Sequence, residues 1–444
     1  MNALSTIPAS RRPTSVLDGF FQLSERGTNV RTEVLAGITT FMTMAYIIFV
    51  NPNVLANAGL PRAGVATATA LAAALMCLAM GLFTNYPFAL ASGLGLNAFL
   101  AFSVVGGLGV PWQTAMGVVF VEGLIITLLV LTRVRESVMN AIPTSLKQAI
   151  GGGIGFFIAF IGLRDAGIVV ADPATFVRLG PIGEPTTLLS LFGLLATAVF
   201  VALRVRGGIL WGILLTAAVG LVTGVASWPT SWESARLDFS TLFRLDIVGA
   251  LQVGLWATIF AFLLTDFFDT MGTVISVGGQ GGFLTQDGRL PRLNRVLLVD
   301  SLAAMIGGLF GVSSVTTYIE SASGVSAGGR TGLTAVVTGI CFLLTLFFIP
   351  LAQIVPAAAT APALVIVGFL MMSVVGEIDW QEASAAIPAF LTLLAIPLTF
   401  SISHGIGLGM VSYVLVKVLT GKAREVSPFL YVVAALFALY FALG

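Results

Sequence analysis

Long apolar stretches follow one another along almost the whole chain, and they limit its fold more than any other feature. The apolar stretches fall at 34–50, 64–84, 87–106, 112–132, 144–163, 186–203, 208–227, 249–277, 296–312, 313–327, 331–350, 353–375, 384–403, 405–419 and 426–443. A helix needs about 20 apolar residues to cross a bilayer; several stretches reach that length, whereas others are too short or too interrupted. Only 9 % of the residues are charged, against about 25 % in soluble domains. The sequence therefore predicts an all-α polytopic membrane protein.

Lys and Arg are concentrated in some of the connecting segments. They precede the first apolar stretch, follow the fourth, sixth and eighth, and recur near the C-terminus. Because positively charged loops stay in the cytoplasm, we expect a multi-pass protein of the plasma (inner) membrane with a cytoplasmic N-terminus. Residues 51–63 and 228–248 then face outward. No apolar segment that resembles a cleavable signal peptide precedes residue 33. Stretch 426–443 fits a helix that crosses the bilayer and one that lies along it equally well.

The two halves of the sequence share short patterns in the same order. The matched pairs are Pro143 to Gly155 with Pro356 to Gly368, Gly208 to Gly212 with Gly405 to Gly409, and Thr114-Ala115 with Thr334-Ala335. Each match alone is weak, because Gly-rich apolar segments resemble one another by chance. Seven segments precede a second half that starts near residue 249. The shared order therefore predicts about 14 segments arranged as an inverted repeat of seven plus seven, with antiparallel halves.

Two carboxylates, Asp266 and Asp269, stand in an apolar segment. No charge occurs from Gly249 to Leu264, and apolar and small residues continue through Val277. An ionised Asp in hydrocarbon is costly unless it faces protein or water, and a three-residue spacing puts both carboxyl groups on roughly one helical face. The alternative is a helix that ends at Leu264 and leaves its acids among the headgroups. The continuing apolar run favours a buried pair.

Two segments in corresponding places of the halves are interrupted. A proline and two glycines break 87–106 ahead of Asn97, and the stretch 313–329 is rich in Ser, Thr and Gly around Glu320. We expect short extended stretches in both. Paired interrupted helices indicate a substrate site at the membrane midplane, because their freed backbone groups can bind a ligand. For Asn97 an interhelical hydrogen bond is an equally good interpretation.

Other polar residues are weaker candidates for a functional site. The single histidine, His404, fits a solvated or hydrogen-bonded group better than a proton relay. Cys77 and Cys341 lie in apolar runs without metal-ligand spacing, so we interpret them as packing residues rather than a disulfide. Glu122 stands alone in the fourth stretch, with no partner to assign, and the glycines of 278–282 fit a flexible turn.

Several classes of protein are disfavoured. The sequence shows no nucleophile elbow, zinc-protease pattern or dinucleotide fingerprint, so we expect no enzyme, no catalytic residue, no metal and no cofactor. The net charge of +1 gives no indication of nucleic-acid binding. A channel would need repeated polar rings along a pore, which the sequence does not show. A transporter remains.

Five runs of residues carry a family resemblance. They are GITTFMTMAYIIFVNP (37–52), LGLNAF (94–99), DFFDTMGT (266–273), SSVTTYIESASGVSAGGRTGLTAVVTG (313–339) and FSISHGIGLGMVSYVLVK (400–417). They resemble the AzgA-like adenine/guanine/hypoxanthine permeases of the nucleobase-ascorbate transporter superfamily over essentially the whole chain. In the ascorbate/xanthine branch an Asn-x-Gly follows the acidic or amide residue, whereas here Ser-Ala-Ser-Gly follows Glu320. Xanthine, uracil and ascorbate are therefore less expected as substrates.

The resemblance implies an architecture and a mechanism. It implies a cytoplasmic segment 1–32, a core domain of 33–132 with 249–350, and a gate domain of 133–248 with 351–444. It further implies proton symport of a purine nucleobase across the lipid bilayer, with the core moving like an elevator against the gate in a homodimer. An anion or other small-solute transporter on the same fold is the alternative, although it would be expected to place a cation at its site.

The resemblance also implies site residues. It matches Asn97, Asp266, Asp269 and Glu320 to positions taken to bind the base or couple protons. A neutral purine needs a carboxylate acceptor, backbone groups and an apolar or aromatic wall, so the expected substrate-binding residues are Glu320, Asp266, Asn97, Phe268, Tyr318, Ile319, Ser321, Ser92 and Gly93. The expected proton-coupling residues are Asp269, Asp266 and Glu320. Burial and a like-charged neighbour favour a proton kept between the two aspartates. Which acid binds base, which carries the proton, and which purine is preferred stay open.

Overall fold

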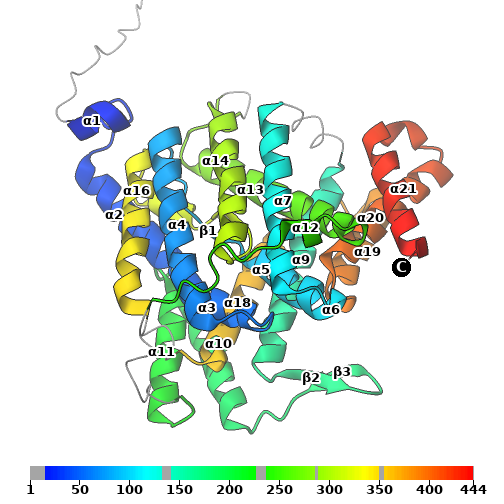
Figure 1. Ribbon diagram of the computed structural model, residues 1–444, viewed down its shortest axis with the longest axis horizontal. Coiled ribbons are helices and arrows are strands. Elements are labelled where there is room, and N and C mark those ends of the chain that lie inside the picture. The colour runs from blue at the N-terminus through cyan, green and yellow to red at the C-terminus, as the bar shows by residue number, and fades with distance from the viewer. Residues whose placement is uncertain (1–15, 133–141, 227–236, 286–288, 350–354, 444) are drawn as a thin grey trace, which may run out of the picture.

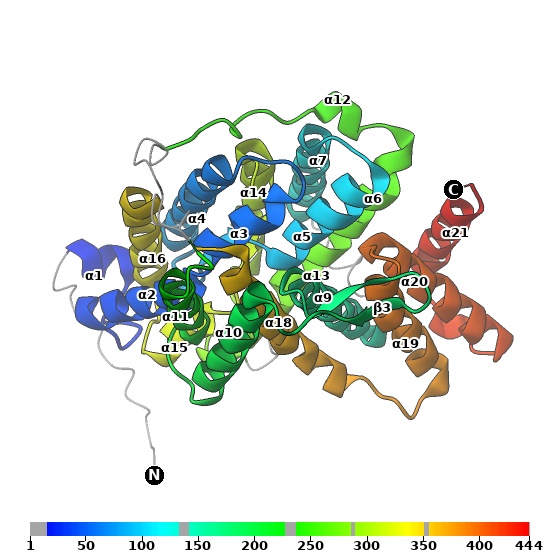
Figure 2. The same ribbon diagram turned by 90° about the horizontal axis from the view of Figure 1, so that it is seen from below.

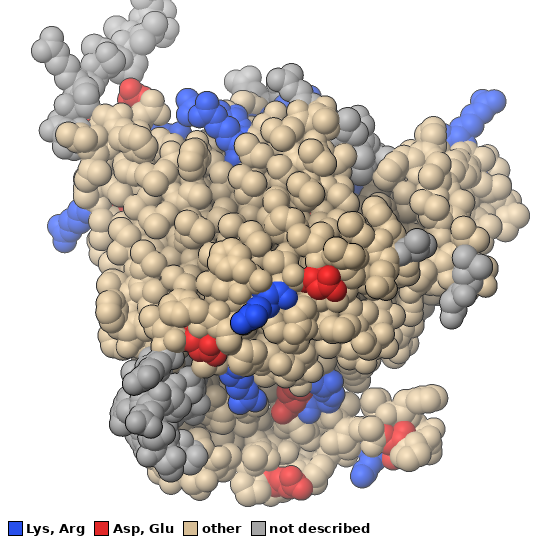
Figure 3. All heavy atoms as spheres, in the orientation of Figure 1, with Lys and Arg blue, Asp and Glu red and all other residues tan. Residues whose placement is uncertain are grey.

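The computed structural model describes residues 16–132, 142–226, 237–285, 289–349 and 355–443. Nine helical spans within these ranges are long and apolar enough to cross a membrane, and five further apolar helices have 10–17 residues. Charged side chains are sparse on the face drawn in Figure 3. The chain is therefore a helical multi-pass membrane protein, as predicted.

The elements of the first half begin with α1 (Val16–Phe21), α2 (Val30–Met44), α3 (Ile47–Ala56), α4 (Arg62–Thr84), β1 (Leu90–Ser92), α5 (Leu94–Ala98), the π-helical η1 (Phe99–Val105), α6 (Gly106–Leu108) and α7 (Trp112–Leu131). They continue with α9 (Thr144–Asp165), β2 (Val169–Asp172), β3 (Phe176–Leu179), α10 (Pro185–Ala202) and α11 (Gly208–Val222). The exposed β2–β3 hairpin is an addition to the predicted all-α fold.

The elements of the second half begin with α12 (Ile247–Ala250), η3 (Val253–Leu255), α13 (Trp256–Gln280), α14 (Leu293–Phe310), β4 (Val315–Thr317), α15 (Ser321–Ser326), α16 (Gly332–Thr345) and η4 (Leu346–Phe348). They continue with α18 (Ala357–Met371), η5 (Met372–Glu377), α19 (Ala383–Leu398), α20 (Ile402–Leu419), η6 (Ala423–Glu425) and α21 (Pro428–Leu443). The sequence-predicted stretch 353–375 lies partly outside the described residues.

Helices pack in two groups. Figures 1 and 2 show α4, α7, α13, α14 and α16 together, and α9, α10, α18 and α19 together, with α3 and α5 between the groups. Small residues allow the closest approaches: a Cβ at Gly332 of α16 would lie 1.9 Å from the carbonyl oxygen of Gly81 on α4, and one at Gly368 of α18 would lie 2.4 Å from that of Gly155 on α9. Only glycine fits such contacts between membrane helices.

A carboxylate fixes one end of the first group. Glu33 on α2 is fully buried and accepts hydrogen bonds from the backbone N–H groups of Arg330 (2.8 Å) and Thr334 (3.2 Å) and from the Thr334 hydroxyl (2.6 Å). Asn85, which ends α4 with a left-handed φ of 56°, accepts from the N–H of Gly332 at 2.8 Å. These bonds satisfy the free N–H groups at the start of α16 and bind α2, α4 and α16 to one another.

The two interrupted segments meet as a short antiparallel sheet. Strands β1 and β4 pair with Leu90 opposite Thr317 and Ser92 opposite Val315, and all six residues are buried. The predicted extended stretches are confirmed. Backbone groups that leave a helix at membrane depth need partners inside the protein, and the two strands supply them to each other. The pairing therefore brings residues 220 or more positions apart into one site.

Candidate functional site

Glu320 and Asp269 lie close to the β1–β4 pair. The hydroxyl of Tyr46, which immediately precedes α3, donates to Oε1 of Glu320 at 2.7 Å. The Thr316 hydroxyl of β4 donates to Oδ2 of Asp269 on α13 at 3.4 Å. The Tyr318 hydroxyl donates to the backbone carbonyl of Ser92, which ties the end of β4 to the end of β1. Asp269 and Glu320 thus both lie beside the paired strands, and their roles in binding and proton coupling stay predictions.

The surrounding helices do not cover either carboxylate completely. Asp269 is exposed, Glu320 is half-buried, and the Ile319 side chain between the strand and α15 is 48 % exposed. Exposed positions continue along the same face of α13 to Gln280, whose amide donates to the exposed Ser326 of α15 at 2.8 Å. We call this open face of α13 and α15 the crevice. Asp269 lies on this face, and Glu320 immediately precedes α15.

Asp266 has a different environment from Asp269. It is only 1 % exposed, and it interacts with Glu122 on α7 and with Asp300 on α14. Asp300 in turn accepts from the Thr317 hydroxyl at 2.8 Å and from the Thr270 hydroxyl at 2.7 Å. Asp266, Glu122 and Asp300 therefore form a cluster of buried carboxyl groups behind the crevice. No partner could be assigned to Glu122 from the sequence, and in the structure it lies beside Asp266.

Asn97 takes part in a buried chain of hydrogen bonds. Its amide nitrogen donates to Oδ1 of Asn51 on α3 at 2.7 Å, and its own Oδ1 accepts from the Ser92 hydroxyl at 2.9 Å. Asn51 donates onward to Thr69 on α4 at 2.9 Å. With Asn97 fully buried, this geometry matches the interhelical interpretation. A direct contact with substrate stays a prediction.

The remaining predicted binding residues of the two broken segments are mostly buried next to the paired strands. Ser321 accepts from the backbone N–H of Ala89 at 2.9 Å, and the N–H of Gly93 donates to the carbonyl of Ser314 at 2.9 Å. Phe268, half-buried on α13, lies with its ring centroid 5.8 Å from Nζ of Lys147 on α9. The aromatic ring thus stands where the two helix groups meet.

Sequence reasoning missed two polar residues of this site. Asp300 is the one acid in the apolar stretch 296–312, and that signal was present. Tyr46 lies in an apolar run, where an aromatic residue ordinarily indicates packing, so only the fold reveals its bond to Glu320.

The residues that were weaker candidates for a functional site have neighbours within hydrogen-bonding distance in the structure. Nε2 of His404 lies 3.4 Å from the Tyr440 hydroxyl, which fits a hydrogen-bonded histidine. Cys77 donates to the carbonyl of Leu90 at 3.2 Å, and both cysteines are free thiols.

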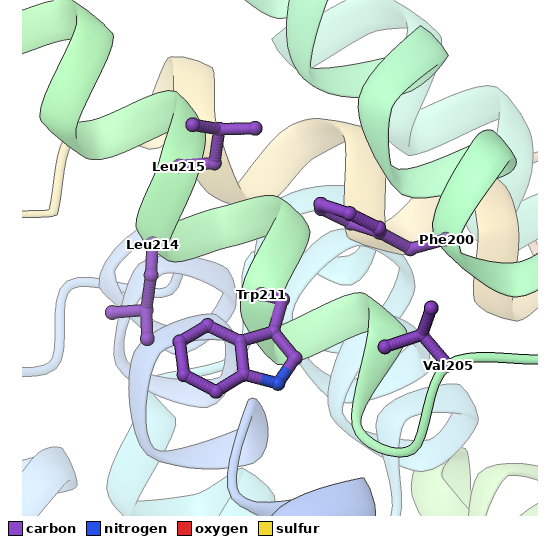
Figure 4. Close-up of a pocket in the computed structure, with 5 residues that line it drawn as sticks. All are labelled: Phe200, Val205, Trp211, Leu214 and Leu215. Atoms are coloured by element: carbon purple, nitrogen blue, oxygen red, sulfur yellow. The ribbon is translucent and has the colours of Figure 1, made fainter.

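Two hollows occur elsewhere among the described residues. One, of about 500 Å³, opens on the surface of α10 and α11 and is lined by Phe200, Val205, Trp211, Leu214 and Leu215 (Figure 4). Its walls are apolar, so it offers nothing to hold a polar ring. The other, of about 180 Å³, lies between α3 and α9 and has a mixed lining. Neither coincides with the crevice.

The helical multi-pass fold and the family comparison together define a membrane transporter. The model of the Permease family matches residues 31–439, and the chain belongs to this family of nucleobase-ascorbate transporters. The predicted family resemblance is confirmed, and the relatives are permeases rather than enzymes.

Curated relatives match over nearly their full length. The guanine/hypoxanthine permease PbuG of Bacillus subtilis is 45 % identical over 95 % of this chain and 98 % of its own. The adenine permease AdeP of Escherichia coli is 43 % identical over 96 % of this chain and 95 % of its own. Among solved structures, the transmembrane domain of the cyanobacterial bicarbonate transporter BicA superposes with a TM-score of 0.63 at 16 % identity, covering 85 % of this chain and 97 % of that domain. That last likeness concerns the fold alone.

Proposed function

We propose that the protein imports purine nucleobases, adenine, guanine or hypoxanthine, by proton symport across the plasma (inner) membrane. The observation that carries the proposal is the placement of Asp269 and Glu320, from two different segments, on one open crevice beside the paired strands. The names of the curated relatives support a purine as substrate. Lys147 lies against the ring of Phe268, but the groups beside the paired strands are the carboxylates of Asp269 and Glu320, so anion transport is not favoured.

The base-binding step uses Glu320 as acceptor. A neutral purine presents ring N–H donors, ring nitrogen acceptors and a flat apolar face. Tyr46 holds Oε1 of Glu320 and so orients the carboxylate toward the crevice. Backbone groups of the adjacent broken segments, around Ser92 and Ile319, supply the complementary hydrogen bonds. Phe268 and Tyr318 supply the ring contact.

The proton-coupling step uses Asp269 with the carboxyl group cluster behind it. Asp266 and Glu122 are buried against each other, and a second negative charge beside the first is costly in such a place. A proton shared between these two carboxyl groups removes one negative charge and so lowers the free energy of the buried cluster. Asp269 stands between this cluster and the crevice, so it is the group that exchanges a proton with solvent.

Repeated contacts support an inverted repeat of seven plus seven segments. In the first half a Cβ at Gly212 would lie 2.0 Å from Oγ1 of Thr197, and in the second half a Cβ at Gly409 would lie 1.9 Å from Oγ1 of Thr392. Both glycines come from a pair matched in the sequence. The same helix contact thus recurs at corresponding places in the two halves.

A second repeated contact involves the matched threonines. Thr114, at the start of α7, donates to Asp246 at 3.0 Å, and Thr334, at the start of α16, donates to Glu33 at 2.6 Å. Glu33 stands at the start of the first repeat, and Asp246 stands just before the start of the second, near residue 249. The same kind of contact at the two starts supports an inverted repeat.

The proposed domains follow the two helix groups. The core comprises 33–132 and 249–350, and the gate comprises 133–248 and 351–444, with the N-terminal segment 1–32 in the cytoplasm. Arg26 donates to the carbonyls of Asn85 and Arg330, so arginines gather at the end of the core nearest the N-terminus, as positive-inside topology requires. An elevator-like movement of core against gate, in a homodimer, completes the proposal.

Uptake by cells that lack their own purine carriers tests this function. Radiolabelled adenine, guanine and hypoxanthine are offered singly and then in competition with xanthine, uracil and ascorbate. The proposal expects saturable uptake of adenine, guanine or hypoxanthine. The other two of these bases should inhibit that uptake more strongly than xanthine, uracil and ascorbate do. Equal inhibition by all six compounds would contradict the assignment to adenine, guanine or hypoxanthine.

A further inference from the structure

The hollow of about 180 Å³ lies where the two helix groups face each other. One wall comes from α3 and the start of α4, and the other from the end of α9 and from α18. Its polar lining consists of Asn53, Asn57, Arg62, Asp165 and Thr360. Two carboxamides, a hydroxyl and two opposite charges therefore converge on one small space outside the crevice. We call this hollow the vestibule.

One helical face connects the vestibule with Glu320. Tyr46, the hydrogen-bond donor to Glu320, is followed at helical spacing by Val50, Asn53 and Asn57, all of which line the vestibule. The backbone bond from the N–H of Val50 to the carbonyl of Tyr46, 3.0 Å, shows that this spacing is helical here. The face thus leads from the candidate site to the vestibule.

A hydrogen bond between the two helix groups lies in the lining of the vestibule. The amide nitrogen of Asn53 on α3 donates to Oγ1 of Thr360 on α18 at 3.1 Å. Thr360 is 3 % exposed, and the apolar Val50 and Leu364 belong to the two opposite walls. Any displacement of one group past the other must break this bond. The bond therefore joins the two groups beside the vestibule in the present arrangement.

The lining of the vestibule suits the edge of a purine. The amide nitrogens of Asn53 and Asn57 already donate to neighbouring oxygens, so each carboxamide presents its Oδ1 as an acceptor for an N–H or amino group of a purine. Arg62 adds donors for the ring nitrogens or the carbonyl, and Asp165, whose Oδ1 is paired with Arg164, lies in the same lining. The apolar Val50, Val54 and Leu364 provide walls for a flat ring.

We propose that the vestibule is a second, weaker nucleobase site, at which a base is held before the contact between Asn53 and Thr360 opens. The proposal rests on the proposed purine transport. Its ligand is the same purine, and its residues are distinct from those of the crevice. Binding at the vestibule lowers the concentration of base needed for half-maximal uptake. The affinity of the crevice depends on its own residues and not on those of the vestibule.

The test compares uptake with equilibrium binding in the variants Asn53→Ala and Asn57→Ala. Uptake of radiolabelled hypoxanthine and adenine by intact cells gives KM and the maximal rate; binding to detergent-solubilised protein gives Kd. Each variant should raise KM about three- to tenfold, the loss expected of one neutral hydrogen bond, with Kd of the tighter site unchanged. Thr223→Val is the control, because its hydroxyl, on the exposed end of α11, bonds only to its own helix.

A second measurement isolates the weaker site. Glu320→Gln should leave residual low-affinity binding of hypoxanthine, and the double variant Glu320→Gln with Asn57→Ala should lose it. KM values of both asparagine variants equal to wild type, or a Kd that rises in step with KM, would overturn the vestibule as a separate site. Wild-type protein that takes up no purine would contradict the proposed function itself, and with it this site.

Discussion

The Tyr46 hydroxyl donates a 2.7 Å hydrogen bond to Oε1 of Glu320, across 274 positions of sequence. This bond fixes the carboxylate of an interrupted segment by a residue from the first span. It sets the direction in which Glu320 presents its charge to the crevice. The consequences can be measured separately for the acceptor, for its donor and for the neighbouring Asp269.

Glu320→Gln should weaken purine binding by roughly 1.5–3 kcal/mol, about ten- to hundredfold, because the amide keeps the volume and one acceptor oxygen but loses the charge. Glu320→Ala should lose more, since the N–H of the base is then unpaired in a partly dry site. Equilibrium binding to detergent-solubilised protein measures both. Thr197→Ala is the control: its hydroxyl bonds to Gly193 within α10, away from the crevice. Equal affinities for Glu320→Gln and wild type would place the base elsewhere.

Tyr46→Phe should weaken purine binding by about 1 kcal/mol, roughly fivefold, because it leaves the ring in the core but frees Glu320 to rotate. A double-mutant cycle with Glu320→Gln separates this effect from a general disturbance of packing. The account expects the two changes to be non-additive, with little further loss when Tyr46→Phe is added to Glu320→Gln. Additive losses would show that Tyr46 acts independently of Glu320.

Asp269→Asn should abolish concentrative uptake more completely than binding. The amide has nearly the same shape and still fits beside Thr316, but it cannot release and take up a proton. Counterflow of labelled against unlabelled hypoxanthine in proteoliposomes should persist in this variant, while accumulation driven by a pH gradient is lost. A variant that still accumulates base against its gradient would remove Asp269 from the coupling step.

Acid should weaken one ion-pair network of the second half. Lys417, Lys422 and Ser384 donate hydrogen bonds to Glu382, mainly Lys417, and they lower the pKa of that carboxyl from 4.5 to about 2. Because the folded pKa is depressed, the stabilisation is complete above about pH 4.5 and is lost as the pH falls toward 2.

Thermal unfolding of the detergent-solubilised protein between pH 7 and pH 3 measures this effect. Glu382→Gln should lower Tm at pH 7 and flatten the acid limb of the Tm profile relative to wild type. The Glu382 side chain is 41 % exposed, so solvent screens its ion pairs and the effect on Tm should be small. Parallel acid limbs in the two proteins would show that Glu382 gives no pH-dependent stability.

Much of the site could be predicted because its signals are local. A glycine-broken stretch, a Ser/Thr-rich stretch around Glu320 and acids in an apolar run are visible without any partner, and membrane physics gives each a meaning. The structure confirms extended stretches in both broken segments and places Asp269 and Glu320 at the crevice.

The sequence alone could not show which residues that are far apart along the chain contact one another. Asn97 bonds Asn51 and Ser92, which makes it a buried connector in this arrangement. Asp266 and Asp269 are three residues apart, yet one is 1 % exposed and the other is open to the crevice, because α7 and α14 cover only one of them. Spacing within a helix indicates a shared side, whereas the neighbouring helices decide which carboxylate meets solvent.

The most direct measurement is accumulation of labelled hypoxanthine and adenine by energised cells, with and without a protonophore. Purine/proton symport predicts accumulation above the external concentration that collapses when the protonophore dissipates the proton gradient, while counterflow continues. Accumulation that the protonophore leaves unchanged would contradict the account.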